Sequence, residues 1–342
     1  QAPKVWETLR EQHSDFTCAK LFWWYNMYSS ADWSITPRPM YPADGRKVFD
    51  VHTHPNTIRA DIKRDLGEFP FPGFWGPAAG VDTPQCSGDC VSRWIAESAK
   101  WIERKHSPTL SLVYLPHLDY NLQRFGPETA AIATDLRKID DIVGGLLDFY
   151  ERIGVQVVLL SEYGITEVNR AVHLNRLFRK QGWLAVKEEL GLEMLNAGDS
   201  RAFAVADHQV AHIYFNRNED SSFRDEVKKL LEKTEGVQSV LDPVAKKELG
   251  ADHERSGDLI AVAKENAWFT YYYWLDDSRA PDFARTVDIH RKPGFDPAEL
   301  FIDPQIVFPR LRIAYRLLQK KLGLRMLMDV IPLDASLVKG SH

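Results

Sequence analysis

The strongest constraint on the fold of this 342-residue chain is a pattern of strand, helix and strand in its middle. Residues 110–115 and 155–160 are short apolar runs bounded by turn residues, which is typical of buried strands. Between them, apolar residues recur at intervals of three and four from Ile132 to Tyr150, which predicts a long helix. Two strands joined by one helix are expected to be parallel, with a right-handed crossover. The pattern therefore predicts an α/β fold with a mostly parallel central sheet flanked by helices.

Turn residues mark the ends of this helix. Pro127 suits its first position and Gly154 the position after its last residue. Two further helices are predicted at 91–105 and 306–322, and we interpret the basic side chains of the second as a solvated face.

Residues 196–264 show a different pattern of predicted strands and helices from the rest of the chain. Strands are predicted at 203–206, 210–215, 237–241 and 258–263, and an amphipathic helix at 222–234. We expect a small α+β insertion subdomain over 196–264, carried by one larger domain that spans 1–342.

Charge and cysteine content narrow the functional classes. Lys and Arg total 43 against 48 Asp and Glu, a net charge of −5, so no global positive field attracts a nucleic-acid polymer or a membrane surface. No apolar run is long enough to span a bilayer, and residues 1–20 lack the apolar core of a signal peptide. We expect a cytoplasmic protein in which Cys86 and Cys90 are incidental thiols.

Acidic residues follow both predicted strands. In an open α/β sheet, ligands bind beyond the carboxyl ends of parallel strands, where Asp119 and Glu162 are expected to meet. Two carboxylates held close together repel each other unless a cation or a proton lies between them. Two interpretations remain open: a metal site, or a turn-capping Asp119 and a solvated Glu162.

Three motifs in chain order resemble the nucleotide pyrophosphatase/phosphodiesterase (type I phosphodiesterase) branch of the alkaline phosphatase superfamily. Its motifs read Pro-Asp-x-x-Gly-His-x-x-Gly-Pro, Ser-Asp-His-Gly and Gly-x-His-Gly. The matching residues are Asp119, Gly126 and Pro127, then Ser161, Glu162 and Gly164, then Gly340 and His342. The resemblance implies an alkaline phosphatase-like fold and metal-dependent hydrolysis of a small phosphate diester or monoester. It also implies one or two divalent ions, with zinc expected, bound by Asp119, Glu162 and His342 after these three side chains converge.

The chain departs from the family pattern at two histidine positions. Gln123 and Tyr163 stand where the family has imidazoles, and both are poorer zinc ligands, so we place them beside the substrate. The family's Thr or Ser nucleophile also has no counterpart here, because the chain opens at Gln1 where that segment would already have passed. We therefore expect an N-terminally incomplete hydrolase domain, whose attacking hydroxyl is not in this chain.

Replacement groups are predicted from two places. His117 lies two residues before Asp119, and residues 288–296 bring an acid, an imidazole and two cations into one loop. Asp288, His290 and His117 are candidate metal ligands, and Arg291 and Lys292 are candidate contacts to a phosphate oxygen. The alternative for the loop is an ordinary surface turn.

Two other functions remain open. Gln123 and Tyr163 replace two histidines of the family pattern, which favours a degenerate phosphate-ligand binding protein without catalysis. His52 and His54 resemble the His-x-His start of amidohydrolase barrels, but that fold needs eight βα repeats that the sequence does not supply.

Overall fold

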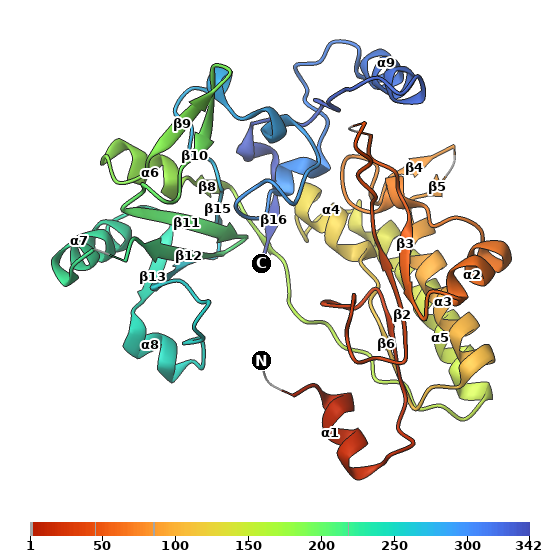
Figure 1. Ribbon diagram of the computed structural model, residues 1–342. Helices are drawn as coiled ribbons and strands as arrows, with labels where there is room; N and C mark the ends of the chain where they lie inside the picture. The colour runs from red at the N-terminus through yellow and green to blue at the C-terminus, as the bar shows by residue number, and fades with distance from the viewer. Residues whose placement is uncertain (1–2, 45, 85, 218) are drawn as a thin grey trace. The chain divides into compact units, whose positions relative to one another are not determined.

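A computed structural model describes residues 3–44, 46–84, 86–217 and 219–342 (Figure 1). Contacts divide the chain into two units. The first unit spans Gln1–Tyr120, Ala130–Leu160 and Tyr315–Met326. The second spans Asn121–Thr129, Ser161–Ala314 and Leu327–His342.

A mixed four-stranded sheet forms the centre of the first unit, in the order β3-β2-β1-β6. β1 (Cys18–Leu21) pairs in parallel with β2 (Trp33–Pro37) and with β6 (Leu110–Val113), whereas β3 (Val51–His54) joins β2 antiparallel. The first predicted strand is thus confirmed. Three of these four strands are parallel, as the predicted α/β class requires.

Two long helices stabilise this sheet. α3 (Cys90–His106) packs against β1, β6 and α5 (Ile132–Arg152), with Ile95 and Ile102 fully buried. Both predicted helices are therefore present. α5 begins at Ile132 rather than at Pro127, because residues 127–130 form turns before the helix.

The second strand of the sequence pattern, 155–160, is the clearest error of the sequence-based prediction. These residues lie outside every sheet, and Val158, Leu159 and Leu160 are each about two-thirds exposed or more. A run of β-branched residues forms a strand only when a neighbouring edge takes up its backbone hydrogen bonds. Here the segment ends the first unit at Leu160, and among the described strands β6 pairs with β1 alone.

An antiparallel sheet dominates the second unit. Its order is β11-β12-β14-β13, and all three pairings are antiparallel. β11 and β12 are joined by the two-residue turn at His208 and Gln209. The strands and the helix predicted within 196–264 are confirmed, whereas their status as an inserted subdomain stays a prediction. The buried aromatic run Tyr271–Trp274 packs in the same core.

The remaining elements have the following bounds. In the first unit they are α1 (Val5–Gln12), α2 (Ile58–Leu66), η1 (Phe71–Gly73), β4 (Asp82–Thr83) and β5 (Cys86–Ser87). The strands of the second unit are β7 (Thr166–Glu167), β8 (Arg170–Val172), β9 (Val186–Glu189), β10 (Leu192–Leu195), β11 (Ala202–Asp207), β12 (Val210–Phe215), β13 (Val237–Leu241), β14 (Leu259–Ala263), β15 (Ala267–Phe269) and β16 (Gly340–Ser341). Its helices are α6 (Leu174–Lys180), α7 (Ser221–Glu232), α8 (Pro243–Glu248), η2 (Asp277–Arg279), η3 (Asp282–Arg285), η4 (Pro297–Leu300) and η5 (Ala335–Leu337). α4 (His117–Phe125) and α9 (Pro309–Lys321) each contain residues of both units. Among the described residues, no helix has the length and apolarity needed to cross a bilayer.

The two loop cysteines form a disulfide. Cys86 and Cys90 are bonded across the turn between β5 and α3, with their Cα atoms 5.5 Å apart. The prediction of incidental thiols is therefore wrong for this pair. A C-x3-C spacing places two Cα atoms within disulfide range where a turn enters a helix, which the sequence argument did not consider.

Candidate functional site

The site is organised by β16, the short strand that precedes His342. β16 pairs antiparallel with β7, with Ser341 opposite Thr166. This register places His342 beside the segment 161–164, and its ring stacks on Tyr163 at a centroid distance of 3.7 Å and an angle of 8°. Two of the three motifs that define the resemblance thus lie side by side within the second unit.

A second imidazole covers the other side of this stack. His208, at the β11–β12 turn, lies with its ring centroid 4.0 Å from that of His342. The Gln209 backbone N–H donates to the His342 carbonyl at 2.7 Å, which fixes the turn to the strand end. Phe295 then contacts His208 at 5.2 Å, so the 288–296 loop reaches this group. We call Tyr163, His342, His208 and Phe295 the ring column.

Burial keeps both imidazoles of the ring column neutral. It lowers the pKa of His208 to about 3, with the nearby His342 as a smaller cause, and lowers the pKa of His342 to about 4. The Nδ1 atoms of both rings are buried and have no hydrogen-bond partner among the described residues. A neutral imidazole with an unused nitrogen is the form that binds a metal ion or accepts a proton.

Gln123 lies next to the strand that leads to His342. Its carbonyl accepts a hydrogen bond from the Lys339 N–H at 2.9 Å, and its side chain is fully buried. In the described part of the chain, neither side-chain amide atom of Gln123 nor the hydroxyl of Ser341 finds a partner. Buried polar atoms without partners are costly, so these groups are candidates for ligand contacts.

The other predicted ligands are distributed over the molecule. Asp119 lies in the first turn of α4, not in a loop, and belongs to the first unit, whereas Glu162 is exposed in the second. Their convergence with His342 therefore stays a prediction. His117 is buried with its Nε2 3.3 Å from Asp135, and burial lowers its pKa more than that carboxylate raises it.

Of the two loop cations predicted to contact a phosphate, Lys292 is already paired with carboxylates, whereas the role of Arg291 stays a prediction. The Lys292 ammonium is buried, 2.7 Å from carboxylate oxygens of both Asp296 and Glu299, and these charges raise its pKa despite the burial. Because this ammonium already forms ion pairs with both carboxylates, the structure does not support a phosphate contact from Lys292. Arg291 is exposed and 3.3 Å from Asp282.

His290 and Asp288 lie in the same loop. His290 is exposed, and the backbone N–H of Asp288 donates to Glu299 at 3.3 Å. Their role as metal ligands stays a prediction.

His52 and His54 lie on β3, where they face Thr36 and Ser34 of β2. Burial lowers the pKa of His52, and its ring contacts Tyr28 at 5.5 Å. Neither the pairings of the described strands nor their order forms a barrel, which removes the fold that an amidohydrolase site requires.

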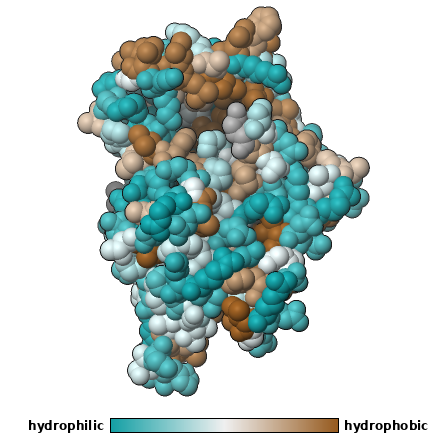
Figure 2. Space-filling model, turned by 90° about the vertical axis from the view of Figure 1, so that its right-hand side faces the viewer, coloured by the Kyte–Doolittle hydropathy of each residue, from teal (hydrophilic) through white to brown (hydrophobic). Residues whose placement is uncertain are grey.

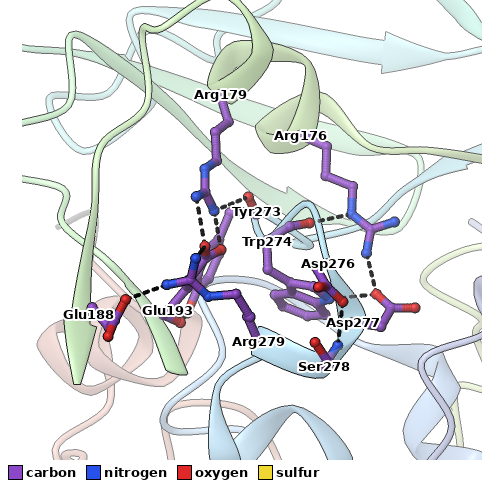
Figure 3. Close-up of polar contacts among 10 residues, drawn as sticks. All are labelled: Arg176, Arg179, Glu188, Glu193, Tyr273, Trp274, Asp276, Asp277, Ser278 and Arg279. Carbon is purple, nitrogen blue, oxygen red and sulfur yellow. Dashed lines mark hydrogen bonds and ion pairs between the residues drawn. The ribbon is translucent and has the colours of Figure 1, made fainter. Parts of the chain in front are cut away.

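A polar network surrounds the buried aromatic run of the second unit (Figure 3). Arg179 donates to both carboxylate oxygens of Glu193, and Arg279 lies 3.4 Å from the same carboxylate. Arg176 donates to the Trp274 carbonyl and to Asp277, each at 2.7 Å. These paired charges order the loop that carries η2.

Beside this network is a cavity of about 800 Å³, which the sequence did not predict. Three arginines and three aspartates contribute to its lining: Arg170, Arg176, Arg285, Asp277, Asp303 and Asp334. Each of these arginines is paired with a carboxylate at 2.7 to 3.0 Å. The cavity is therefore not a site of unbalanced positive charge for a phosphate.

His173 also lines this cavity and supports a pH-dependence prediction. Its Nδ1 lies 2.7 Å from the Thr270 hydroxyl, and burial lowers its pKa to about 4. The unfolded chain takes up the proton more readily, so this contribution to stability is complete above about pH 6.5 and is lost as the pH falls toward 4. At pH 5 the loss should be about 2 kcal/mol. Urea unfolding near pH 7 and pH 5 should show a smaller loss in His173→Asn; equal losses in both proteins would contradict the assignment.

Within the described residues, no three His, Cys, Asp or Glu side chains come close enough together to bind a metal ion. His342 fits the chemistry of a ligand by itself, but a complete ligand set is not assembled. The sequence analysis did not single out His208. Only the tertiary contact of the β11–β12 turn with the strand end marks it as part of the site.

Comparison with known proteins agrees with the motif resemblance. The family model described as "Type I phosphodiesterase / nucleotide pyrophosphatase" matches residues 1–296. No curated protein matches the chain significantly.

The solved structures that match the chain have low sequence identity to it. Phosphonoacetate hydrolase from Sinorhizobium meliloti, in complex with phosphonoformate, is 12% identical with a TM-score of 0.49; the match covers 82% of this chain and 62% of that one. Murine ectonucleotide pyrophosphatase/phosphodiesterase 5 in complex with AMP is 15% identical with a TM-score of 0.45, covering 78% and 55%. The human protein of the same name is 13% identical with a TM-score of 0.42, covering 79% and 56%. The chain thus spans less than two thirds of the length of each.

Proposed function

Because the chain belongs to the type I phosphodiesterase/nucleotide pyrophosphatase family, we propose that it takes part in metal-dependent hydrolysis of a small phosphate diester or monoester. The observation that supports this site most directly is the stack of His342 on Tyr163, which joins the second and third family motifs.

The proposed roles follow from the environment of each side chain. His342 presents a neutral, buried imidazole whose Nδ1 has no partner among the described residues, so it is the first candidate for a zinc ligand. Asp119 and Glu162 are proposed to complete the set, with Asp288, His290 and His117 as further candidates. Since the described residues do not assemble three ligands, we derive no step of the reaction through a metal.

Other groups are proposed to contact the substrate rather than a metal. The buried amide of Gln123 has donors and an acceptor that are unused in the described part of the chain, and either can bond a phosphate ester. Tyr163 holds the His342 ring in place from one face. Arg291 is the more accessible of the two predicted loop cations, because Lys292 is buried. The nucleophile stays unassigned.

The cellular location also stays a proposal. A cytoplasmic location was expected from the cysteine content, but the Cys86–Cys90 disulfide argues for an oxidising compartment instead. Mass spectrometry of thiol-alkylated protein from its native host would decide between the two.

We expect His342→Ala to weaken zinc binding at least about tenfold, because it removes the only imidazole that the family motif assigns here. Isothermal titration of the purified chain with Zn²⁺ measures the change, and hydrolysis of a nitrophenyl phosphodiester should fall with it wherever the starting protein is active. His253→Ala is the matched control, since His253 is exposed and far along the chain from all three motifs. Unchanged zinc affinity in His342→Ala would refute the assignment.

A second function, ligand binding without catalysis, is favoured by the lack of a three-ligand cluster in the described residues. The purified chain would then contain little metal and still bind AMP. Metal analysis by inductively coupled plasma spectrometry, with calorimetry of AMP binding, separates the two functions.

A further inference from the structure

The basic helix α9 exposes its apolar side chains. No residue of α9 is buried, and its half-buried positions include Ile313, Arg316 and Lys320. On the opposite side lie Leu311, Tyr315, Leu318 and Leu322, spaced at i, i+4, i+7 and i+11, and each is more than half exposed. We call these four residues the α9 stripe. A helix on the surface of a globular protein normally has the reverse arrangement, with its apolar side packed against the protein.

The exposed apolar surface continues at both ends of the helix. Val307 and Phe308 precede it, and Leu324 follows it, each more than half exposed. Figure 2 shows apolar side chains at the surface near the top of the view, the end at which Figure 1 labels α9. The exposed apolar surface therefore extends along the whole helix and suits contact with a flat partner surface.

The segment that carries the stripe is basic. Residues 304–328 contain no Asp or Glu, although the whole chain has a net charge of −5. The cations in this segment are Arg310, Arg312, Arg316, Lys320, Lys321 and Arg325. On a helical projection of α9, Arg310 and Lys321 border one side of the stripe, and Arg312, which is paired with Asp329, borders the other.

From the stripe and its basic border, we propose that α9 binds an anionic lipid surface, with its axis in the plane of the membrane. The stripe enters the boundary between headgroups and acyl chains, and the bordering cations contact lipid phosphates. The expectation of no membrane partner came from the net charge of the whole chain, which hides this local excess. Docking to a second copy is disfavoured, because two α9 helices placed stripe to stripe would bring the bordering cations Arg310 and Lys321 of both copies together.

Co-sedimentation with vesicles tests the proposal on the full chain. We expect binding to phosphatidylcholine vesicles that contain phosphatidylglycerol, weak binding to phosphatidylcholine alone, and release as salt is raised. Replacing Leu318 and Leu322 with Glu should abolish binding. Replacing Arg310 and Lys321 with Gln should lower the partition coefficient about thirtyfold.

The matched control replaces two leucines elsewhere that are at least as exposed, Leu190 and Leu249, with Glu. Circular dichroism should show the same spectrum for all variants, because every changed side chain is exposed. The proposal is overturned if the unchanged chain does not sediment with anionic vesicles at low salt, or if the stripe variant binds as well as the control. A dimer on size-exclusion chromatography that only the stripe variant loses, without vesicle binding, would overturn it in favour of self-association.

Discussion

Lys292→Met should destabilise the second unit by about 3 to 5 kcal/mol, one of the two largest effects expected in this protein. The ammonium lies 2.7 Å from carboxylate oxygens of Asp296 and Glu299, and all three side chains are about 1% exposed. Without the cation, two buried carboxylates lose the charge that pairs with both of them. Met has a similar length, so the loss reports charge rather than volume.

Urea unfolding monitored by Trp fluorescence measures this change, because Trp268 and Trp274 are buried in the same unit. Lys187→Met is the control: this lysine is exposed and paired with Glu189, so its loss should change the free energy of unfolding by less than about 0.5 kcal/mol. Adding Asp296→Asn and Glu299→Gln to Lys292→Met should restore most of the stability. A Lys292→Met protein as stable as the Lys187→Met control would show that the buried charges are not coupled as described.

The same lysine shows where sequence reasoning reaches its limit. In the sequence, Lys292 is a basic residue beside Arg291, His290 and a Pro-Gly turn, a pattern equally typical of a phosphate site and of a surface turn. Its burial depends on η4, which brings Glu299 back to the loop seven residues later. The local composition does not indicate that Glu299 contacts Lys292, so the sequence could not distinguish a ligand-binding cation from a structural one.

Periodicity predicted the helices well and one strand poorly. α3 and α5 were predictable because their apolar faces repeat over 17 and 21 residues. The run 155–160 has the same β-branched character as a core strand, but strand formation also needs a partner edge, which periodicity does not report. The strands predicted at 203–206 and 210–215 did form, because the two-residue turn between them gives each strand a partner locally.

The candidate site was predictable in part for a related reason. The motifs at 161–164 and 340–342 stand out because their residues and their order along the chain resemble motifs of the family. The structure brings these two segments side by side through the β7–β16 pairing. His208 has no such local signal, since it enters the site only because the Gln209 N–H bonds the His342 carbonyl.

Gly340→Ala should have the other large effect, because it forces apart the contact that positions His342. A Cβ at this position would lie 2.1 Å from the backbone oxygen of Leu122 and 2.8 Å from the Ile165 side chain. A backbone oxygen cannot rotate away as a side chain can, so either β16 or the end of α4 must move. We expect a loss of at least about 3 kcal/mol in the free energy of unfolding.

Displacement of β16 should also separate His342 from Tyr163 and His208, so zinc affinity should fall in Gly340→Ala even under conditions in which the variant stays folded. Gly164→Ala is the matched control: it has no atom within 4 Å of the added Cβ, and its stability should change by less than about 0.5 kcal/mol. Thermal unfolding and zinc titration of both variants measure the two effects. If Gly340→Ala were as stable as Gly164→Ala, the close packing of β16 on Leu122 would be wrong. A folded Gly340→Ala protein with full zinc affinity would show that metal binding does not depend on the position of β16.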